Sequence, residues 1–251
     1  MSPASRTTRT SRLASAVDVL RYRGGRLARR LSEPDGHGRD ALVAFGALSV
    51  VDLLATAGTP TVVRRAAKPL LAPALAAHVL RRRRDRDEPV PVALVAGLGC
   101  SAVGDTALLW QRHQSAFLLG MAAFLGTQVS YTATHLRGGA VAGIRAHPRR
   151  ALGCLAVWAG ANAVIQPGLD RRLRLPVAGY SLALAVMGAT ALGVGGKVAV
   201  GGAAFVGSDT LIGLQAAGIE FPSQEVLIMA GYLLGQYLIV SGTLERRDAD
   251  G

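Results

Sequence analysis

The chain has 251 residues, of which 50% are hydrophobic, and its mean hydropathy is +0.33. Only 18% of the residues are charged, against about 25% in an ordinary soluble domain, so the composition excludes a disordered chain and disfavours a soluble enzyme. The net charge of +12 is compatible with nucleic-acid binding, but the basic residues form short clusters between long apolar stretches, which predicts an integral membrane protein that does not bind nucleic acid.

Residues 1–40 are expected to form an Arg-rich cytoplasmic tail, because this segment is polar and contains nine arginines. Its middle, residues 13–31, could form a basic amphipathic helix on anionic lipid, although Gly24 and Gly25 interrupt the pattern. The favoured interpretation is a mostly disordered tail. The segment is not a signal peptide, because its first apolar run is too short and too charged.

From Ala41 onward the chain alternates between apolar segments and short loops that are basic or contain Pro and Gly. Most of the segments approach the roughly 20 residues that a helix needs to cross the hydrocarbon core. We therefore expect an all-α polytopic membrane bundle of about eight transmembrane helices in a domain of residues 41–242, followed by a polar C-terminal tail, 243–251. Seven spans are the alternative, because only Gly195 separates two of the segments. The predicted segments are 41–58, 66–80, 90–110, 115–136, 149–165, 176–194, 196–217 and 223–242.

The basic residues also predict an orientation. With the N-terminus inside, the inner segments hold 21 Lys and Arg residues and the outer loops hold six; without the tail the ratio is 12 to six. Because cytoplasmic loops are enriched in Lys and Arg, we expect both termini to face the cytoplasm. The high Arg, Ala and Gly content suggests a bacterial plasma membrane.

A weak internal similarity links the two halves of the domain. Residues 103–106 (VGDT) resemble residues 206–210 (VGSDT), and residues 125–128 (LGTQ) resemble residues 234–236 (LGQ). The offsets are similar and span four predicted helices, which fits a parallel four-plus-four helix repeat. Chance similarity among helices rich in small residues is the competing explanation.

Few ionisable side chains lie inside the predicted spans. Such a side chain costs at least about 2.5–3.5 kcal/mol on insertion scales, so it normally faces the bundle interior or a water-filled cavity. Asp105 and Asp209 lie at nearly the same depth in parallel spans, and Lys68 lies at a comparable height, so two carboxylates and an amine could converge. The alternative is a buried ion pair that only fixes helix packing, and Asp52, which has no partner motif, is expected to be structural.

Other catalytic chemistries find no support in the sequence. There is no Gly-x-Ser-x-Gly elbow, no His-Glu-x-x-His helix and no histidine in the middle of a span. Cys100 and Cys154 lack the spacing of a metal site, so neither a metal nor a cofactor is expected. If the protein is a hydrolase, carboxylates must carry the reaction.

Five motifs in order resemble the YhhN family of integral membrane proteins, which includes the lysoplasmalogenases. They span the whole predicted membrane domain and comprise a Lys-Pro segment, a Ser-x-x-Gly-Asp motif, a fourth-helix pattern together with Tyr131, a Phe-x-x-Ser-Asp motif and a last-helix Tyr…Gln-x-Leu-Ile ending. The corresponding residues are 67–73 (AKPLLAP), 101–105 (SAVGD), 117–124 (FLLGMAAF), 202–209 (GAAFVGSD) and 232–239 (YLLGQYLI). Relatives often carry His where this chain has Gln128, so the resemblance does not extend to a histidine-assisted proton transfer.

The resemblance implies an eight-helix membrane hydrolase. It would cleave the vinyl ether bond of a lysoplasmalogen to a fatty aldehyde and glycerophosphocholine or glycerophosphoethanolamine. This chemistry needs one protonated and one ionised carboxyl group, as in glycosidases, and burial together with a nearby lysine can separate the two states. Asp105 and Asp209 are the expected catalytic pair, with the roles of acid and base left open. Lys68 would tune a carboxylate or contact the lipid phosphate, and the other residues expected to bind the substrate are Ser101, Gln128, Tyr131, Ser208, Tyr232 and Gln236.

Two other functions remain open at this point. A non-enzymatic lipid transporter or lipid-binding protein would use the same acids as a proton-coupled gate. A hydrolase of the same fold could also act on a different lysolipid, because pocket shape decides the choice of headgroup and chain. The sequence leaves the oligomeric state open.

Overall fold

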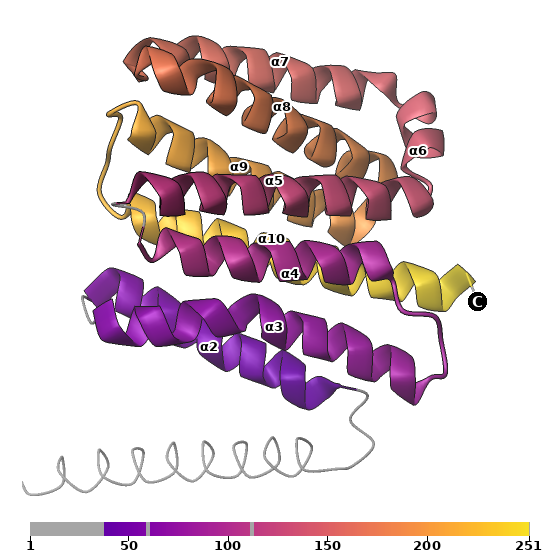
Figure 1. The fold of residues 1–251 in the computed structure, drawn as a ribbon. Helices are drawn as coiled ribbons and strands as arrows, with labels where there is room; N and C mark the ends of the chain where they lie inside the picture. The colour runs from indigo at the N-terminus through magenta and orange to yellow at the C-terminus, as the bar shows by residue number, and fades with distance from the viewer. Residues whose placement is uncertain (1–37, 59–60, 111–112, 251) are drawn as a thin grey trace, which may run out of the picture.

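The computed structural model describes residues 38–58, 61–110 and 113–250, and in this part of the chain all regular structure is helical (Figure 1). The predicted all-α bundle is therefore confirmed, and each of the eight predicted segments coincides with one long helix. These helices are α2 (Arg39–Gly58), α3 (Thr61–Asp85), α4 (Val92–Leu108), α5 (Gln114–Arg137), α7 (Pro148–Ile165), α8 (Arg171–Val194), α9 (Gly196–Ala216) and α10 (Gln224–Asp250). The arginine-rich segment expected as a tail lies outside the described residues, except for residues 38–40.

The helices differ from the predicted segments mainly at their ends. The seven-residue helix α6 (Ala140–Ala146) and a 3-10 turn, Gln166–Gly168, occupy stretches that were expected to be loops. Helix α3 continues to Asp85, and α10 continues through the polar residues after position 242. Apolar content marks where a helix lies in the bilayer, whereas a helix itself ends where its backbone hydrogen bonds end, so polar extensions escape a hydropathy criterion.

Five of the described helices are long and apolar enough to cross a membrane, namely α2, α5, α8, α9 and α10. Helix α4 is apolar but has 17 residues, and the arginines of α3 lower its mean hydropathy. The expected count of eight crossings is thus not confirmed, although the eight long helices are present. The outer surface of the bundle exposes large apolar side chains, such as those of Leu54, Val62 and Leu175. A multi-pass membrane protein presents such a surface to lipid.

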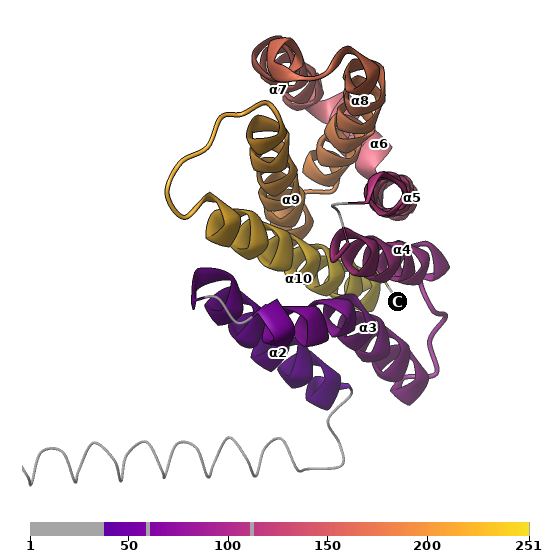
Figure 2. The same cartoon turned by 60° about the vertical axis from the view of Figure 1, so that its left-hand side comes forward.

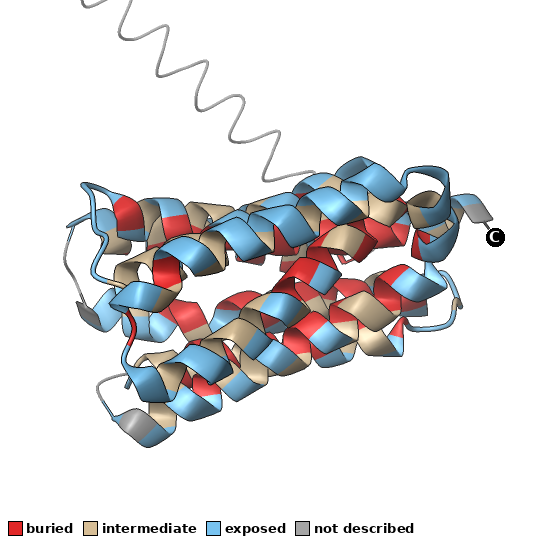
Figure 3. Cartoon of the chain, turned by 90° about the horizontal axis from the view of Figure 1, so that it is seen from above, coloured by how far each residue is buried: buried red, intermediate tan, exposed pale blue. Residues whose placement is uncertain are grey.

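The helices run roughly antiparallel along one common direction (Figure 1). Helices α2 and α3 lie at one side of the bundle and α7 at the opposite side, with α4, α5, α9 and α10 between them (Figures 1 and 2). Seen along the perpendicular direction, the buried residues face the interior between two rows of helices, and the exposed residues face outward (Figure 3). Helices α5, α8 and α10 end at the same end of the bundle (Figure 1).

Glycines allow α4 and α5 to approach each other closely. A Cβ atom added at Gly97 would lie 2.5 Å from the ring of Tyr131, and one added at Gly104 would lie 2.7 Å from the ring of Phe124. Small residues serve the same purpose in other membrane bundles, where close van der Waals packing holds helices together. Two aromatic rings of α5 are thereby fixed against the helix that contains Asp105.

Candidate functional site

Asp105 is the centre of a buried cluster of polar side chains. It lies in the last turn of α4 and is only 1% exposed to solvent. The Tyr232 hydroxyl of α10 donates a 2.6 Å hydrogen bond to Oδ2 of Asp105, and Nζ of Lys68 lies 4.0 Å from Oδ1. A carboxylate that faces a cation and accepts a phenolic hydrogen bond is compensated for the water it has lost.

Lys68 reaches Asp105 from the beginning of α3. It is 9% exposed and directly precedes Pro69, one of two prolines inside this helix. A proline removes a helical N–H and clashes with the carbonyl four residues earlier, so the backbone hydrogen bonding around Lys68 is weakened. The ammonium group therefore lies beside a position at which α3 lacks one backbone hydrogen-bond donor.

Gln236 connects the remaining polar groups of the cluster. Its amide Nε2 donates to the Ser101 hydroxyl at 2.8 Å and to the Tyr232 hydroxyl at 3.2 Å, and its Oε1 accepts a hydrogen bond from Tyr131. Ser101 also shares a 3.1 Å hydrogen bond with Thr127. We refer to Lys68, Ser101, Asp105, Tyr131, Tyr232 and Gln236 as the Asp105 cluster. All six were predicted site residues, and the structure brings them together from four helices.

Two phenylalanine rings pack around this cluster. Phe205 of α9 makes edge-to-face contacts with Tyr131 and Tyr232, and Phe124 makes one with Tyr232. Edge-to-face pairs are worth about 0.5–1.5 kcal/mol beyond their buried area. The rings hold both tyrosine hydroxyls in place and lower the local dielectric around the carboxyl group.

Asp209 forms a second, simpler centre on α9. The Tyr180 hydroxyl of α8 donates a 2.6 Å hydrogen bond to its Oδ2. The Gln128 side chain of α5 lies beside both residues, yet neither of its polar atoms makes a hydrogen bond within the described structure. Asp209 has no ion pair with any described residue, so its surroundings differ from those of Asp105.

Ser208 takes a different direction from its neighbour Asp209. Its hydroxyl donates a 2.8 Å hydrogen bond to the backbone oxygen of Ile228. This hydrogen bond links α9 to α10 and uses the only proton that the hydroxyl can donate. The structure thus places Ser208 in a helix–helix contact, outside the Asp105 cluster.

The two carboxyl groups lie close enough to interact electrostatically. Each carboxyl group has a glutamine from the other half of the chain nearby. Gln236 of α10 donates hydrogen bonds to Ser101 and Tyr232 beside Asp105 of α4. Gln128 of α5 lies beside Asp209 of α9. The halves that resemble each other in sequence therefore each provide an aspartate for one centre and a glutamine for the other.

Two residues that the sequence did not assign to the site belong to these surroundings. Tyr180, the partner of Asp209, is not among the residues that the sequence predicts for the site. Asp52 of α2 is completely buried, and neither of its oxygens has a hydrogen-bond partner among the described residues. It lies within electrostatic reach of Lys68 and Asp105. A comparison of the depth of Tyr180 in its predicted span with that of Asp209 could have placed the tyrosine near this carboxyl group. The position of Asp52 depends on how α2 packs, which the sequence does not encode locally.

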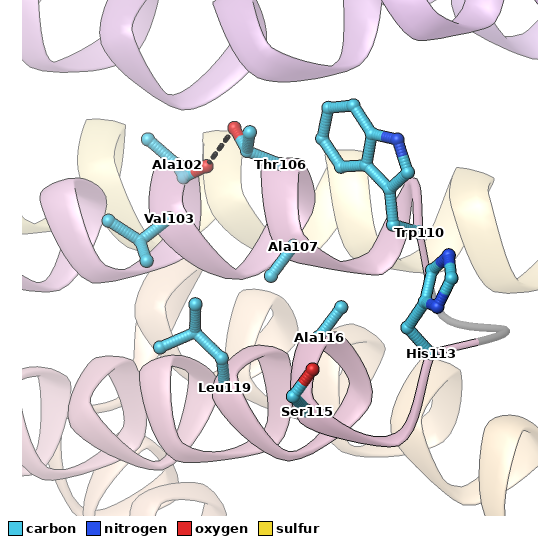
Figure 4. Close-up of a pocket in the computed structure, with 9 residues that line it drawn as sticks. All are labelled: Ala102, Val103, Thr106, Ala107, Trp110, His113, Ser115, Ala116 and Leu119. Atoms are coloured by element: carbon cyan, nitrogen blue, oxygen red, sulfur yellow. Dashed lines mark hydrogen bonds between the residues drawn. The ribbon is translucent and has the colours of Figure 1, made fainter.

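A shallow apolar groove of about 620 Å³ runs along the outer side of α4 and α5 (Figure 4). Trp110 and His113 mark its end, and Thr106 uses its hydroxyl to bond the Ala102 backbone (Figure 4). Asp105 does not line the groove, because successive helix residues point about 100° apart. The groove is therefore separate from the Asp105 cluster.

Comparison with known proteins gives a consistent result. The family model of the YhhN family matches residues 63–243. Over 186 residues the chain is 32% identical to the lysoplasmalogenase TMEM86B of Sus scrofa, and the match covers 66% of this chain and 70% of that protein. Over 170 residues it is 30% identical to the lysoplasmalogenase TMEM86B of Homo sapiens, covering 60% of this chain and 63% of that protein. No solved structure matches the chain.

Proposed function

The chain belongs to the YhhN family, and we propose that it is a membrane hydrolase that cleaves the vinyl ether bond of a lysoplasmalogen. The similarity to two lysoplasmalogenases supports the substrate class. The observation that carries the mechanism is the pair of interacting carboxyl groups: Asp105 is buried and faces a lysine, whereas Asp209 is half-buried and does not. Such a pair suits acid–base chemistry on an acid-labile ether.

We assign the proton-donating role to Asp209 and the ionised role to Asp105. The Lys68 ammonium favours the charged form of Asp105, whereas no cation among the described residues compensates a charge on Asp209. Two like charges in one low-dielectric region repel each other, so ionisation of Asp105 favours a neutral Asp209. The glycosidase carboxylates divide their roles in the same way.

The reaction would then begin at the carbon–carbon double bond. The Asp209 carboxyl group gives its proton to the vinyl carbon that does not bear oxygen, and the ether oxygen shares its lone pair to form an oxocarbenium ion. The Asp105 carboxylate stabilises this cation and takes a proton from the water that attacks the oxygen-bearing carbon. The product of this step is a hemiacetal.

Collapse of the hemiacetal restores both carboxyl groups. Asp105 returns its proton to the departing glycerol oxygen as the carbon–oxygen bond breaks, and the Asp209 carboxylate takes the hemiacetal hydroxyl proton. The fatty aldehyde and the glycerophosphate-containing headgroup leave, and one water has been consumed. In this scheme Tyr232 and Lys68 orient Asp105, Tyr180 orients Asp209, and Ser101, Tyr131, Gln128 and Gln236 complete the polar surface that faces the substrate.

Substitution of each aspartate tests this proposal. We expect Asp105→Asn and Asp209→Asn to lower aldehyde release from a lysoplasmalogen in detergent micelles by about 10²–10⁴-fold, the usual contribution of a positioned acid or base. Glu220→Gln, which removes an exposed carboxylate in the loop before α10, is the matched control. Helicity and gel-filtration behaviour establish that each variant is folded. If both aspartate variants are folded and keep near wild-type rates, the carboxylate mechanism is wrong.

The same assay separates catalysis from transport. A transporter that uses these acids as a proton-coupled gate would release no aldehyde in micelles, because micelles have no second compartment. A hydrolase releases aldehyde there. Parallel assays with a lysolipid that carries an ester in place of the vinyl ether would identify a hydrolase of different substrate class.

We also propose that the bundle end at which α2 begins and α10 finishes faces the cytoplasm (Figure 1). This end holds the arginine-rich finish of α3 and the basic residues around α6 and the end of α10. An excess of Lys and Arg on one side of a bundle predicts the cytoplasmic side. The Asp105 cluster then lies in the half of the bundle nearer the opposite surface. Labelling of cysteines introduced at either end in sealed vesicles would test this orientation.

A further inference from the structure

A small polar cavity lies at the opposite end of the bundle from the Asp105 cluster, where α5, α8 and α10 finish (Figure 1). It has a volume of about 130 Å³, several times the roughly 30 Å³ that one water occupies in the liquid. Thr243 of its lining lies 11 residues beyond Tyr232 on α10, which is about 16 Å along the helix. The cavity is therefore separate from the acidic centres. Its lining consists of Thr134, His135, Arg137, Gly138, Val194, Thr243, Arg246 and Arg247.

The charge of this lining is entirely positive. Three arginines contribute to it, and no carboxylate does. Arg137, Arg246 and Arg247 form no ion pair with a carboxylate in the described part of the chain, whereas Arg82, Arg83 and Arg86 nearby are all paired with Asp248. Guanidinium groups that converge without counter-charges are typical of sites that bind carboxylate or phosphate.

A buried histidine in the lining of the same cavity has an unused hydrogen-bonding atom. His135 is 2% exposed, and its Nδ1 lies 3.2 Å from the Thr190 hydroxyl. That hydroxyl donates its proton to the Met187 backbone oxygen at 2.9 Å, so Nδ1 of His135 must carry the proton and act as donor. Nε2 then holds a lone pair, and it has no hydrogen-bond partner among the described residues. Nε2 is itself buried, so a ligand in the cavity reaches it only when neighbouring side chains shift.

An unpaired buried acceptor is costly unless a ligand or water satisfies it, by about 1–3 kcal/mol. The combination of three cationic donors with one neutral acceptor defines the matching ligand. It needs anionic oxygens for the arginines and a hydroxyl hydrogen for Nε2 of His135. Hydrogen phosphate has both, and so does a phosphate that adjoins a glycerol hydroxyl.

We propose that this cavity binds a phosphate group that carries or adjoins a hydroxyl, either free in solution or in the headgroup of a glycerophospholipid. The three arginines hold the phosphate oxygens, and Nε2 of His135 accepts the hydroxyl proton. Val194 and Gly138 close the cavity without adding charge. The site lies at a membrane surface, where both a soluble phosphate and a lipid headgroup can reach it.

The first test measures binding of free phosphates to the purified full-length protein in detergent. Inorganic phosphate and glycerol 3-phosphate are titrated at constant ionic strength, with the melting temperature and calorimetry as readouts, because a ligand that binds the native state raises its melting temperature. Sulfate is the decisive comparison, because it has the same charge as hydrogen phosphate but no hydroxyl proton. We expect phosphate to bind at least tenfold more tightly than sulfate, and His135→Phe to abolish this difference.

Substitutions locate the site. We expect Arg246→Gln and Arg137→Gln each to weaken phosphate binding by at least tenfold. Arg145→Gln is the matched control, because Arg145 is an exposed arginine at the end of α6 and does not line the cavity. Arg246 is itself exposed, so its replacement keeps the test valid even if the His135 variant does not fold. Equal loss in the Arg145 and Arg246 variants would show general attraction to a basic surface and would overturn the proposal.

The second test distinguishes the two sources of the phosphate. The protein is reconstituted in nanodiscs of phosphatidylcholine alone or with phosphatidylglycerol, whose headgroup has free hydroxyls. A rise in melting temperature with phosphatidylglycerol that Arg246→Gln removes identifies the lipid headgroup as the ligand. Binding of free phosphates without that rise identifies a soluble ligand. If neither source binds in an Arg246-dependent way, the proposal is wrong.

Discussion

Tyr232 donates a 2.6 Å hydrogen bond to Asp105 although 127 residues separate them in the chain. The hydrogen bond joins the last helix of the bundle to α4, and Gln236 donates to the same tyrosine oxygen from one turn further along α10. The orientation of the Asp105 carboxyl group thus depends on a helix from the other half of the protein. Activity should respond to changes on α10 as well as on α4.

Tyr232→Phe removes the hydroxyl and keeps the ring. We expect this variant to release aldehyde about tenfold more slowly. A hydrogen bond to a charged group is worth about 1.5–3 kcal/mol, and we expect only part of this energy to be lost from the transition state, because Lys68 still orients Asp105. Tyr237→Phe on the same helix is the control, because the cluster does not include Tyr237. Unchanged rates in Tyr232→Phe would remove the tyrosine from the proposed mechanism.

Lys68→Met should separate charge from packing. We expect a loss of aldehyde release of at least 100-fold, because without the ammonium group the charged form of buried Asp105 loses its compensating cation. Arg64→Gln, which breaks an ion pair with Glu225 on the exposed surface, should change the free energy of unfolding by less than about 1 kcal/mol and leave the rate unchanged. Equal activity of the two variants would argue that Lys68 has only a packing role.

Asp52→Asn tests whether this buried acid participates in the reaction or only balances Lys68. Asp52 has no hydrogen bond to the cluster, so we expect its rate to fall by less than about tenfold, well below the loss from a positioned proton-transfer group. Measuring Asp52→Asn beside Asp105→Asn in one assay makes the comparison direct. A loss in Asp52→Asn as large as that in Asp105→Asn would place three acids, not two, in the mechanism.

Gly97→Ala should disturb the cluster through Tyr131. The added methyl group would lie 2.5 Å from the tyrosine ring, and overpacking of this kind costs about 1–3 kcal/mol of stability. We expect a lower melting temperature and a reduced rate, because a displaced ring cannot keep its hydrogen bond to Gln236. Gly99→Ala, two residues along the same helix, has nothing within 4 Å of the new Cβ and should behave like the wild type.

Asp248→Asn should destabilise the protein more than any surface change at the same end. Asp248 pairs with Arg82 and Arg86 at 2.5 Å and with Arg83 at 3.3 Å, and Arg83 is 2% exposed. Removing one partner of a buried ion pair costs about 3–5 kcal/mol when the remaining charge has no other partner. Glu88 still pairs with Arg83, so we expect a loss of stability below that range. Glu245→Gln breaks the exposed pair with Lys197 and is the control. Thermal unfolding in detergent would distinguish the two; similar melting temperatures would contradict this role for Asp248.

The fold was predictable to the extent that burial in lipid requires long apolar helices. All eight apolar segments became long helices, but the seven-residue α6 was not expected, because so short a helix leaves no apolar pattern. The continuation of α10 to Asp250 was also not expected. Its polar last turns are held by arginines of α3 that are more than 160 residues away, and contacts at such a separation leave no local trace in the sequence.

The candidate site was partly readable because ionisable residues are rare inside apolar segments. Depth along each helix was sufficient to group Lys68 with Asp105, since the length of a helix follows from its residue count. Rotation about each helix axis was not predictable, because it depends on packing against neighbours. For this reason the sequence did not predict that Ser208, which precedes Asp209 in its motif, contacts α10 instead. It also did not predict that Asp52, which belongs to no motif, lies near Lys68.

The place of Tyr232 and Gln236 on the final helix has a consequence for biogenesis. A nascent chain that is inserted into the bilayer as far as α9 already contains both aspartates. The residues of α10 that hydrogen-bond around Asp105 have not yet been inserted at this stage. Polar groups stranded in this way are unfavourable in lipid, so the partly inserted chain should be short-lived or held by the insertion machinery. Only release of the complete polypeptide lets the Asp105 centre form.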